Sequence, residues 1–202
     1  MVGEIGTIMK LNSLIKRINL ASQSPARLEI LRNQGLEVGA YPQDLDEHTD
    51  KTHPGEVVED LAMQKLSSFM KSPDFDPSVV SLACDTLISF QGKLIGKAHS
   101  DNEAREQIKM FAGNTHEVFS GYALCLNGKI YHGYDCTKVS FREISPSELE
   151  NYIKSQEWRG AAGSYHIQGL AKGFIYHVAG DINTVIGLPL FKVSEIITHN
   201  AQ

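Results

Sequence analysis

Short apolar runs and longer amphipathic stretches alternate along the chain, which is typical of a protein that mixes strands and helices. The first apolar run, at residues 18–21, predicts a strand. Ser24 and Pro25 then favour a helix start, and Gly35 favours its end. After a polar linker, the spacing of apolar residues predicts a second helix over residues 54–70.

The rest of the chain continues this mixture of strands and helices. Apolar runs, capping boxes and turn residues predict, in order, strands at 79–84 and 87–90 before the Gln91–Gly92 turn, a helix opened by Ser100 and Glu103, a hairpin of 118–126 and 130–141 around Asn127–Gly128, a helix opened by Ser145 and Glu148, a strand at 174–178, and a helix after Pro189. No internal repeat is present. The sequence therefore predicts one α/β domain with a mixed sheet over residues 18–200, preceded by an extension of residues 1–17.

Composition and charge restrict the classes of partner. The 202 residues are 42% hydrophobic and 21% charged, enough apolar material for a substantial core. The formal net charge of -5 argues against a broad nucleic-acid surface, so any anion site has to be local. The first twenty residues contain neither a signal-peptide segment nor a membrane span, which predicts a cytoplasmic protein without a membrane partner.

The cysteines and histidines do not form a metal-binding motif. Cys84, Cys125 and Cys136 are odd in number and lack metal-ligand spacing, which favours a reducing compartment and a core role. The eight histidines are scattered along the chain. A zinc site therefore has little support.

The stretch SQSPAR, at residues 22–27, permits two interpretations. It is a good helix start, with Ser24 as N-cap. It is also a strand-to-helix junction, where free backbone N–H groups and the positive end of the helix dipole attract phosphate. In that case Ser22, Ser24 and Arg27 converge on one anion.

Three charged residues stand at positions where a functional role competes with a structural one. Lys65 lies within the apolar face of the 54–70 helix, where it either extends along the face to water or directs its ammonium into a cleft. Asp85 follows the apolar run 79–84, as a turn residue or as a ligand-facing group at a strand end. Lys97 lies between an extended segment and a helix start, where the ordinary interpretation is a solvent-exposed surface lysine.

Taken in order, six segments resemble the signature segments of the Maf family of nucleoside triphosphate pyrophosphatases. They cover residues 20–190 and read LASQSPARLEIL, DLDEH, ACDTLISFQGKLIGKAHS, FAGNTHEVFSGYAL, GAAGSYHIQG and AGDINTVIGLPL. Ser22, Ser24 and Arg27 match three positions of the first motif, while Ala26 stands where many members carry an arginine. The other functional positions fall on Glu47, Lys65, Asp85, Thr86, Lys97 and Gln168.

The resemblance implies an elongated, two-lobed α/β fold with helices flanking the mixed sheet and a central cleft, a divalent cation, Mg²⁺ or Mn²⁺, and a homodimer. It also implies hydrolysis of a nucleoside triphosphate to the monophosphate and pyrophosphate. Ser22, Ser24, Arg27, Lys65 and Lys97 would then bind the triphosphate. Asp85 would be the general base or, with Glu47, a metal ligand, and these alternatives stay open.

The resemblance further implies that three positions determine the nucleobase preference, and here they are Ala26, Thr86 and Gln168. Thr86 and Gln168 resemble the dTTP/UTP type of the family, and Ala26 departs from it. A glutamine amide both donates and accepts, as the edge of uracil or thymine requires. We therefore expect dTTP and UTP to be preferred. The alternatives are a 7-methyl-GTP pyrophosphatase and a nucleotide-binding regulator of septum formation that does not turn its ligand over.

Overall fold

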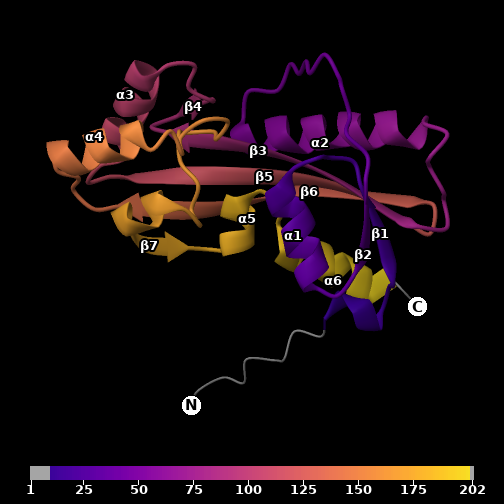
Figure 1. Ribbon diagram of the computed structural model, residues 1–202. Coiled ribbons are helices and arrows are strands. Elements are labelled where there is room, and N and C mark those ends of the chain that lie inside the picture. Colours follow the sequence, from indigo (N-terminus) through magenta and orange to yellow (C-terminus); the bar gives the residue numbers. More distant parts are fainter. Residues whose placement is uncertain (1–9, 201–202) are drawn as a thin grey trace.

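The computed structural model describes residues 10–200 and forms one continuous mixed sheet with helices on both faces (Figure 1). Its elements are η1 (Leu11–Ser13), β1 (Arg17–Leu20), α1 (Pro25–Asn33), β2 (Glu37–Ala40), α2 (Pro54–Met70), β3 (Val80–Phe90), β4 (Lys93–Ile95), α3 (Asp101–Phe111), β5 (Thr115–Leu126), β6 (Lys129–Phe141), α4 (Pro146–Lys154), η2 (Leu170–Phe174), β7 (Ile175–Ala179), α5 (Ile182–Ile186) and α6 (Leu190–Asn200). The prediction of an α/β fold with a mixed sheet is confirmed.

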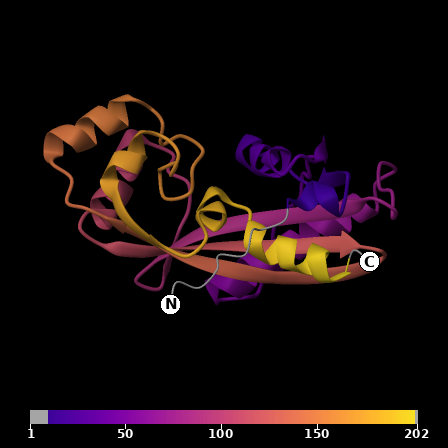
Figure 2. The same cartoon turned by 90° about the horizontal axis from the view of Figure 1, so that it is seen from below.

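The strands are arranged in the order β2-β1-β3-β5-β6-β7, and β4 also pairs with β3. The pairs of β1 with β2 and β3 are parallel, whereas the other pairs are antiparallel. The predicted hairpin is present, because β5 and β6 turn at Asn127 and Gly128, both of which have positive φ angles. The long strands β3, β5 and β6 form the spine of the molecule (Figure 2).

Two lobes share this spine. One end of the spine packs with α3, α4 and η2 around a core that includes Phe111, Phe141 and Trp158. At the other end, α1 and α6 cover one face of the sheet and pack with β1 around a second core. Helix α2 covers the opposite face. We call these parts the α3–α4 lobe and the α1–α2 lobe. The elongated, two-lobed shape agrees with the expectation from the sequence.

The length of strand β3 differs from the sequence-based expectation. The apolar runs before and after Asp85 and Thr86 suggested two strands, with Asp85 at the end of the first. Instead, β3 continues through both residues, which lie opposite Gly121 and Ser120 of β5. Antiparallel pairing along the full length outweighs the low strand propensity of a single aspartate. Asp85 is therefore held in the middle of a rigid strand.

One edge of β3 pairs with β5, and along the other edge the strand pairing is interrupted in the middle. Strand β1 pairs with it at residues 80–82, and β4 pairs with it at residues 88–90. Residues 83–87 have no strand neighbour on this side among the described strands. We call this stretch the open edge of β3. Because side chains alternate along a strand, Asp85 points to the α2 face and Thr86 to the opposite face.

Helix α2 lies very close to the sheet at the level of Asp85. Gly121, which lies opposite Asp85, has no room for a side chain, since a β-carbon there would collide with the carbonyl group of Val58. Lys65 follows Val58 by about two helical turns on the same face. The close contact at Gly121 therefore brings Lys65 within reach of β3.

Two further features differ from the sequence-based expectations. The short strand β2, Glu37–Ala40, was missed because its residues EVGA carry little apolar signal. Leu11 belongs to the predicted N-terminal extension, yet it is fully buried in the core of the α1–α2 lobe. Residues 1–9 of that extension lie outside the described part of the chain.

Candidate active site

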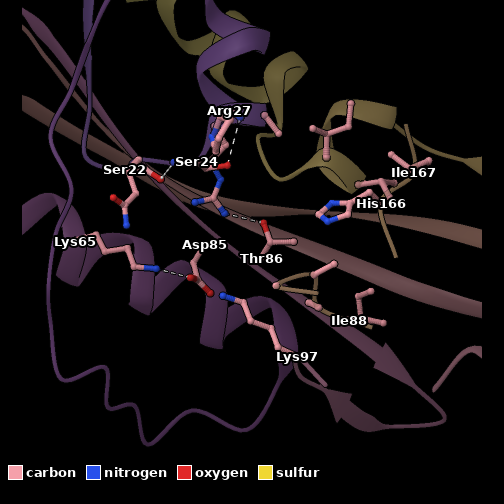
Figure 3. A pocket seen from close by; sticks show the side chains of 18 of the residues that line it. Ser22, Ser24, Arg27, Lys65, Asp85, Thr86, Ile88, Lys97, His166 and Ile167 are labelled. Carbon is pink, nitrogen blue, oxygen red and sulfur yellow. Dashed lines mark hydrogen bonds and ion pairs between the residues drawn. The ribbon is translucent and has the colours of Figure 1, made fainter. Parts of the chain in front are cut away.

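A cleft of about 780 Å³ lies between the two lobes at the open edge of β3 (Figure 3). Its lining comes from the β1–α1 junction, the 42–47 linker, α2, β3, Lys97, the 160–168 loop and α5. It includes every predicted site residue: Ser22, Ser24, Ala26, Arg27, Glu47, Lys65, Asp85, Thr86, Lys97 and Gln168. Folding therefore brings together residues that are separated by up to 146 positions (from Ser22 to Gln168).

The two serines of the β1–α1 junction stabilise the start of the helix and also face the cleft, so both interpretations of this stretch are compatible with the structure. Ser24 is the N-cap of α1, and its Oγ accepts a hydrogen bond from the N–H of Arg27 at 3.5 Å. The Ser22 Oγ accepts a hydrogen bond from the Ser24 N–H at 3.1 Å. Both side chains line the cleft. Because each hydroxyl accepts here, its proton remains free to be donated to an anion.

Arg27 is more constrained than the sequence suggested. Its guanidinium donates to the carbonyl of Gly187 at 2.7 Å, to the carbonyl of Cys84 at 2.8 Å and to Oγ1 of Thr86 at 3.1 Å. Three of its five N–H donors are thus committed to the protein. Arg27 joins α1, the open edge of β3 and the loop after α5, and it presents its positive charge to the cleft from a fixed position.

The three predicted specificity residues line the cleft from three elements: Ala26 from α1, Thr86 from β3 and Gln168 from the 160–168 loop. Thr86 is fixed by Arg27 and by a 2.8 Å hydrogen bond with the Ser120 hydroxyl. Gln168 is exposed, and Ala26 is half-buried on α1. A smaller hollow of about 150 Å³ also contacts both Ala26 and Gln168. The small side chain at position 26 therefore leaves space beside Gln168.

Lys65 does not extend to water. Its ammonium lies 2.5 Å from a carboxylate oxygen of Asp85 and 2.9 Å from one of Glu47. Only 14% of the Lys65 side chain and 12% of the Asp85 side chain are exposed, compared with 41% for Glu47. The interpretation of Lys65 as a cation directed into the cleft agrees with this geometry.

Lys97 lies just beyond β4, and its backbone forms a bridge with Ala162 of the loop on the α3–α4 lobe. Figure 3 shows Lys65 and Lys97 reaching toward Asp85 from two sides. The Lys97 side chain is exposed and lines the cleft. Two ammonium groups carried by different lobes therefore flank one buried carboxylate.

Glu47 and Asp85 are the carboxylates available to a metal ion. Both contact the same lysine nitrogen, so their oxygens lie close together. Within residues 10–200, no group of three or more His, Cys, Asp or Glu side chains is placed to hold a metal ion. Mg²⁺ needs only one or two carboxylates when phosphate oxygens and water complete its shell. The donor set thus fits an ion that binds together with a phosphorylated substrate.

Sequence analysis missed several residues at this site. Tyr165 and Ile167 line the cleft from the 160–168 loop, together with Ile88 of β3. The Tyr165 hydroxyl lies 2.7 Å from Nε2 of the buried His116. Burial lowers the pKa of His116 to about 4, so its imidazole is neutral at pH 7. Only the family segments that contain these residues could have pointed to them.

The cysteines are outside the lining of the cleft. Cys84 and Cys125 are buried, as predicted, and Cys136 is half-buried. Burial raises the pKa of the Cys84 thiol to about 11, which keeps it protonated. None of the helices between residues 10 and 200 is long and apolar enough to cross a membrane.

Comparison with known proteins gives a consistent result. Residues 17–200 match the family described as Maf-like protein. A protein of Pyrococcus horikoshii named dTTP/UTP pyrophosphatase is 40% identical over 179 residues, which cover 89% of this chain and 94% of the relative. Proteins of the same name from Pyrococcus abyssi and Bacillus cereus are 38% and 33% identical over 180 residues. Each alignment covers 89% of this chain, with 94% of the first relative and 87% of the second.

Proposed function

Since this chain belongs to the Maf-like protein family, we propose that it hydrolyses nucleoside triphosphates, with dTTP and UTP preferred, to the monophosphate and pyrophosphate. The observation that carries the proposal is the buried Asp85 carboxylate between Lys65 and Lys97, in a cleft with room for a nucleotide. A protein that only bound nucleotides has no need of a carboxylate there, since the carboxylate repels phosphate unless a metal ion lies between them. An enzyme needs such a group to activate water.

The reaction requires little covalent work from the protein. Asp85 accepts a proton from a water molecule, whose oxygen attacks the α-phosphorus. The bond between that phosphorus and the oxygen bridging to the β-phosphorus breaks, and pyrophosphate leaves with the bond electrons. Lys65, Lys97 and Arg27 offset the charge that develops on the phosphate oxygens, and Ser22 and Ser24 donate neutral hydrogen bonds.

A divalent cation, Mg²⁺ or Mn²⁺, is part of the proposal. Glu47 and Asp85 are the residues that would hold it, and it would supply further neutralisation of phosphate charge. Before a cation binds, Lys65 occupies the position between these two carboxylates. The ammonium thus keeps the carboxylates together and prevents their mutual repulsion in the free protein.

The base preference gives a direct test with purified protein and Mg²⁺. We expect kcat/KM for dTTP and for UTP to exceed that for 7-methyl-GTP, because the Gln168 amide can pair with the alternating edge of uracil or thymine. Gln168 is exposed in the free protein, so its amide is covered only when a base binds, and an amide then left without a partner costs about 1–3 kcal/mol, more than we expect from a missing arginine. Pyrophosphate release measured over a range of nucleotide concentrations provides these values.

Two substitutions refine this prediction. Ala26→Arg is expected to sharpen the preference for dTTP and UTP, and Gln168→Glu is expected to weaken it. Gln91→Glu, in the exposed turn after β3, makes the same chemical change outside the cleft and serves as the control. A kcat/KM for 7-methyl-GTP above those for both dTTP and UTP would instead show that position 26 dominates the choice of base.

We further propose a cytoplasmic homodimer that needs no nucleic acid. The odd number of cysteines, all three of them free of disulfides in the described structure, supports the compartment: Cys84, Cys125 and Cys136. Large apolar side chains on neighbouring elements β7, α5 and α6 support self-association: Tyr176 is 69% exposed, Ile182 49% and Phe191 50%. Light scattering of the purified chain should give twice its 22.3 kDa mass, and a monomer at micromolar concentration would contradict the dimer.

A further inference from the structure

Two segments of the α3–α4 lobe, the Lys97 segment and the 160–168 loop, form its side of the cleft, and a hydrogen-bonded pair of side chains reinforces the backbone contacts between them. We infer that this pair, Gln107 and Ser164, is a positioning device that fixes Lys97 and Gln168 relative to one another. The inference deepens the proposed function and rests on it. It concerns residues outside the cleft that act through their neighbours in the chain.

The Gln107 side chain binds both segments at once. From α3, its Nε2 donates to the carbonyl of Gly96 at 3.2 Å, one residue before Lys97. Its Oε1 accepts a hydrogen bond from the Ser164 hydroxyl at 2.6 Å. The same Gly96 carbonyl also accepts from the N–H of Gly163 at 3.0 Å. The Lys97 segment and the 160–168 loop are therefore joined by a direct backbone contact and, in addition, through the side chain of one glutamine.

Ser164 has a backbone conformation that a serine rarely adopts. Its φ is +63°, in the left-handed region, and it follows Gly163 with a φ of +67°. Serine is less stable than glycine in this region, so the surroundings must hold it there. Ser164 is fully buried, and its carbonyl accepts a 2.9 Å hydrogen bond from the Tyr152 hydroxyl of α4. A glycine would remove the strain and also remove the hydroxyl that binds Gln107.

The loop held in this way presents much of the cleft surface. Residues 160–162 and 165–168 line the cleft, whereas Ser164 and Gln107 do not. Gln168 lies four residues beyond Ser164, and Ala162 forms the bridge with Lys97. Loss of the pair would leave the two segments joined only by the Gly163–Gly96 hydrogen bond and the Lys97–Ala162 bridge, so that their relative position is fixed less firmly. Misplacement of binding groups by about 1 Å is enough to weaken a nucleotide complex considerably.

The test compares Gln107→Met with the unchanged protein, since methionine keeps the side-chain length and removes both hydrogen bonds. We expect KM for dTTP to rise by about fivefold to tenfold. We also expect kcat to change by less than about threefold, because Asp85 on β3 and Lys65 on α2 lie outside the two segments that the pair joins. In the nucleotide-free protein, amide hydrogen exchange should become faster in residues 160–168. Ser164→Ala should give the same changes in KM, kcat and hydrogen exchange. If Ser164→Ala does not fold, Gln107→Met alone still tests the inference.

The matched control is Gln156→Met. Gln156 donates to Asp101 and to the carbonyl of Ile153 and accepts from Arg159, and all three partners lie in the same lobe but outside the cleft lining, so KM and exchange in residues 160–168 should stay unchanged. Gln107→Glu, which keeps an acceptor for Ser164 but no donor for Gly96, should fall between Gln107→Met and the unchanged protein.

A KM within twofold of the unchanged value for Gln107→Met, or no change of exchange in the loop, would overturn the inference. A fall in kcat alone would also overturn it. If the unchanged protein does not hydrolyse dTTP, the proposed function fails. The exchange comparison then still decides whether Gln107 holds the loop in the free protein.

Discussion

Asp85→Asn is expected to lower kcat for dTTP hydrolysis by at least about 100-fold, as the loss of a general base does. Asparagine has nearly the shape of aspartate and still accepts a hydrogen bond from Lys65, so the fold and the cleft should be retained. It cannot accept a proton from water. Pyrophosphate release by the purified variant, with its thermal unfolding temperature measured alongside, tests this expectation.

Asp76→Asn is a suitable control. The Asp76 carboxylate also accepts a hydrogen bond from one side chain, Ser78, at 2.7 Å, but it lies on an exposed loop before β3. The kcat of the Asp76→Asn protein should equal that of the unchanged protein. A folded Asp85→Asn protein with kcat within threefold of the unchanged value would remove Asp85 from the mechanism.

Binding of Mn²⁺ separates the two roles considered for Asp85. Electron paramagnetic resonance measures the affinity of the protein for Mn²⁺ independently of turnover. If Asp85 acts as base and Glu47 holds most of the ion, Asp85→Asn loses turnover and keeps Mn²⁺ affinity. If Asp85 is chiefly a ligand, both are lost, and Glu47→Gln shows a similar loss of affinity.

The second large effect is expected for the two lysines that flank Asp85. Lys97→Met should lower kcat/KM for dTTP by about 10-fold to 150-fold, because a charged hydrogen bond to phosphate contributes about 1.5–3 kcal/mol. Its unfolding temperature should not change, since the side chain is exposed. Steady-state kinetics and thermal unfolding of the same sample measure both quantities.

Lys65→Met should combine a similar loss of kcat/KM with a lower unfolding temperature. Its removal leaves Asp85, which is 8% exposed, without its cation, and an unpaired buried charge destabilises the fold. Lys109→Met on α3 removes an exposed lysine that pairs with Glu106 on the same helix, so it should alter neither quantity. Unchanged kinetics for Lys97→Met would make Lys97 an ordinary surface residue.

Local signals in the sequence predicted those parts of the site that depend on local structure. Ser24 and Pro25 mark the start of α1 correctly, and Lys65 was noticed because it interrupts an apolar face. The resemblance to the Maf family then added Glu47, Thr86 and Gln168. None of these signals depends on the position of a distant segment.

Other parts of the site depend on contacts between distant segments, and the sequence could not reveal them. The continuity of β3 through Asp85 results from pairing with β5, which overrides the local polar signal. The contact of the Arg27 guanidinium with Gly187 joins residues 160 positions apart. Strand β2 was missed because its pairing with β1, rather than its apolar content, stabilises it.

The open edge of β3 has a consequence for solubility. An unpaired strand edge offers N–H and carbonyl groups that can add a strand from another molecule, the first step of aggregation. Here Arg27 occupies the Cys84 carbonyl, and Asp85 places a charge on the open edge itself. Charged side chains at an edge are a common protection against such intermolecular strand addition. The residues proposed to process nucleotides would thus also prevent two chains from joining through their active sites.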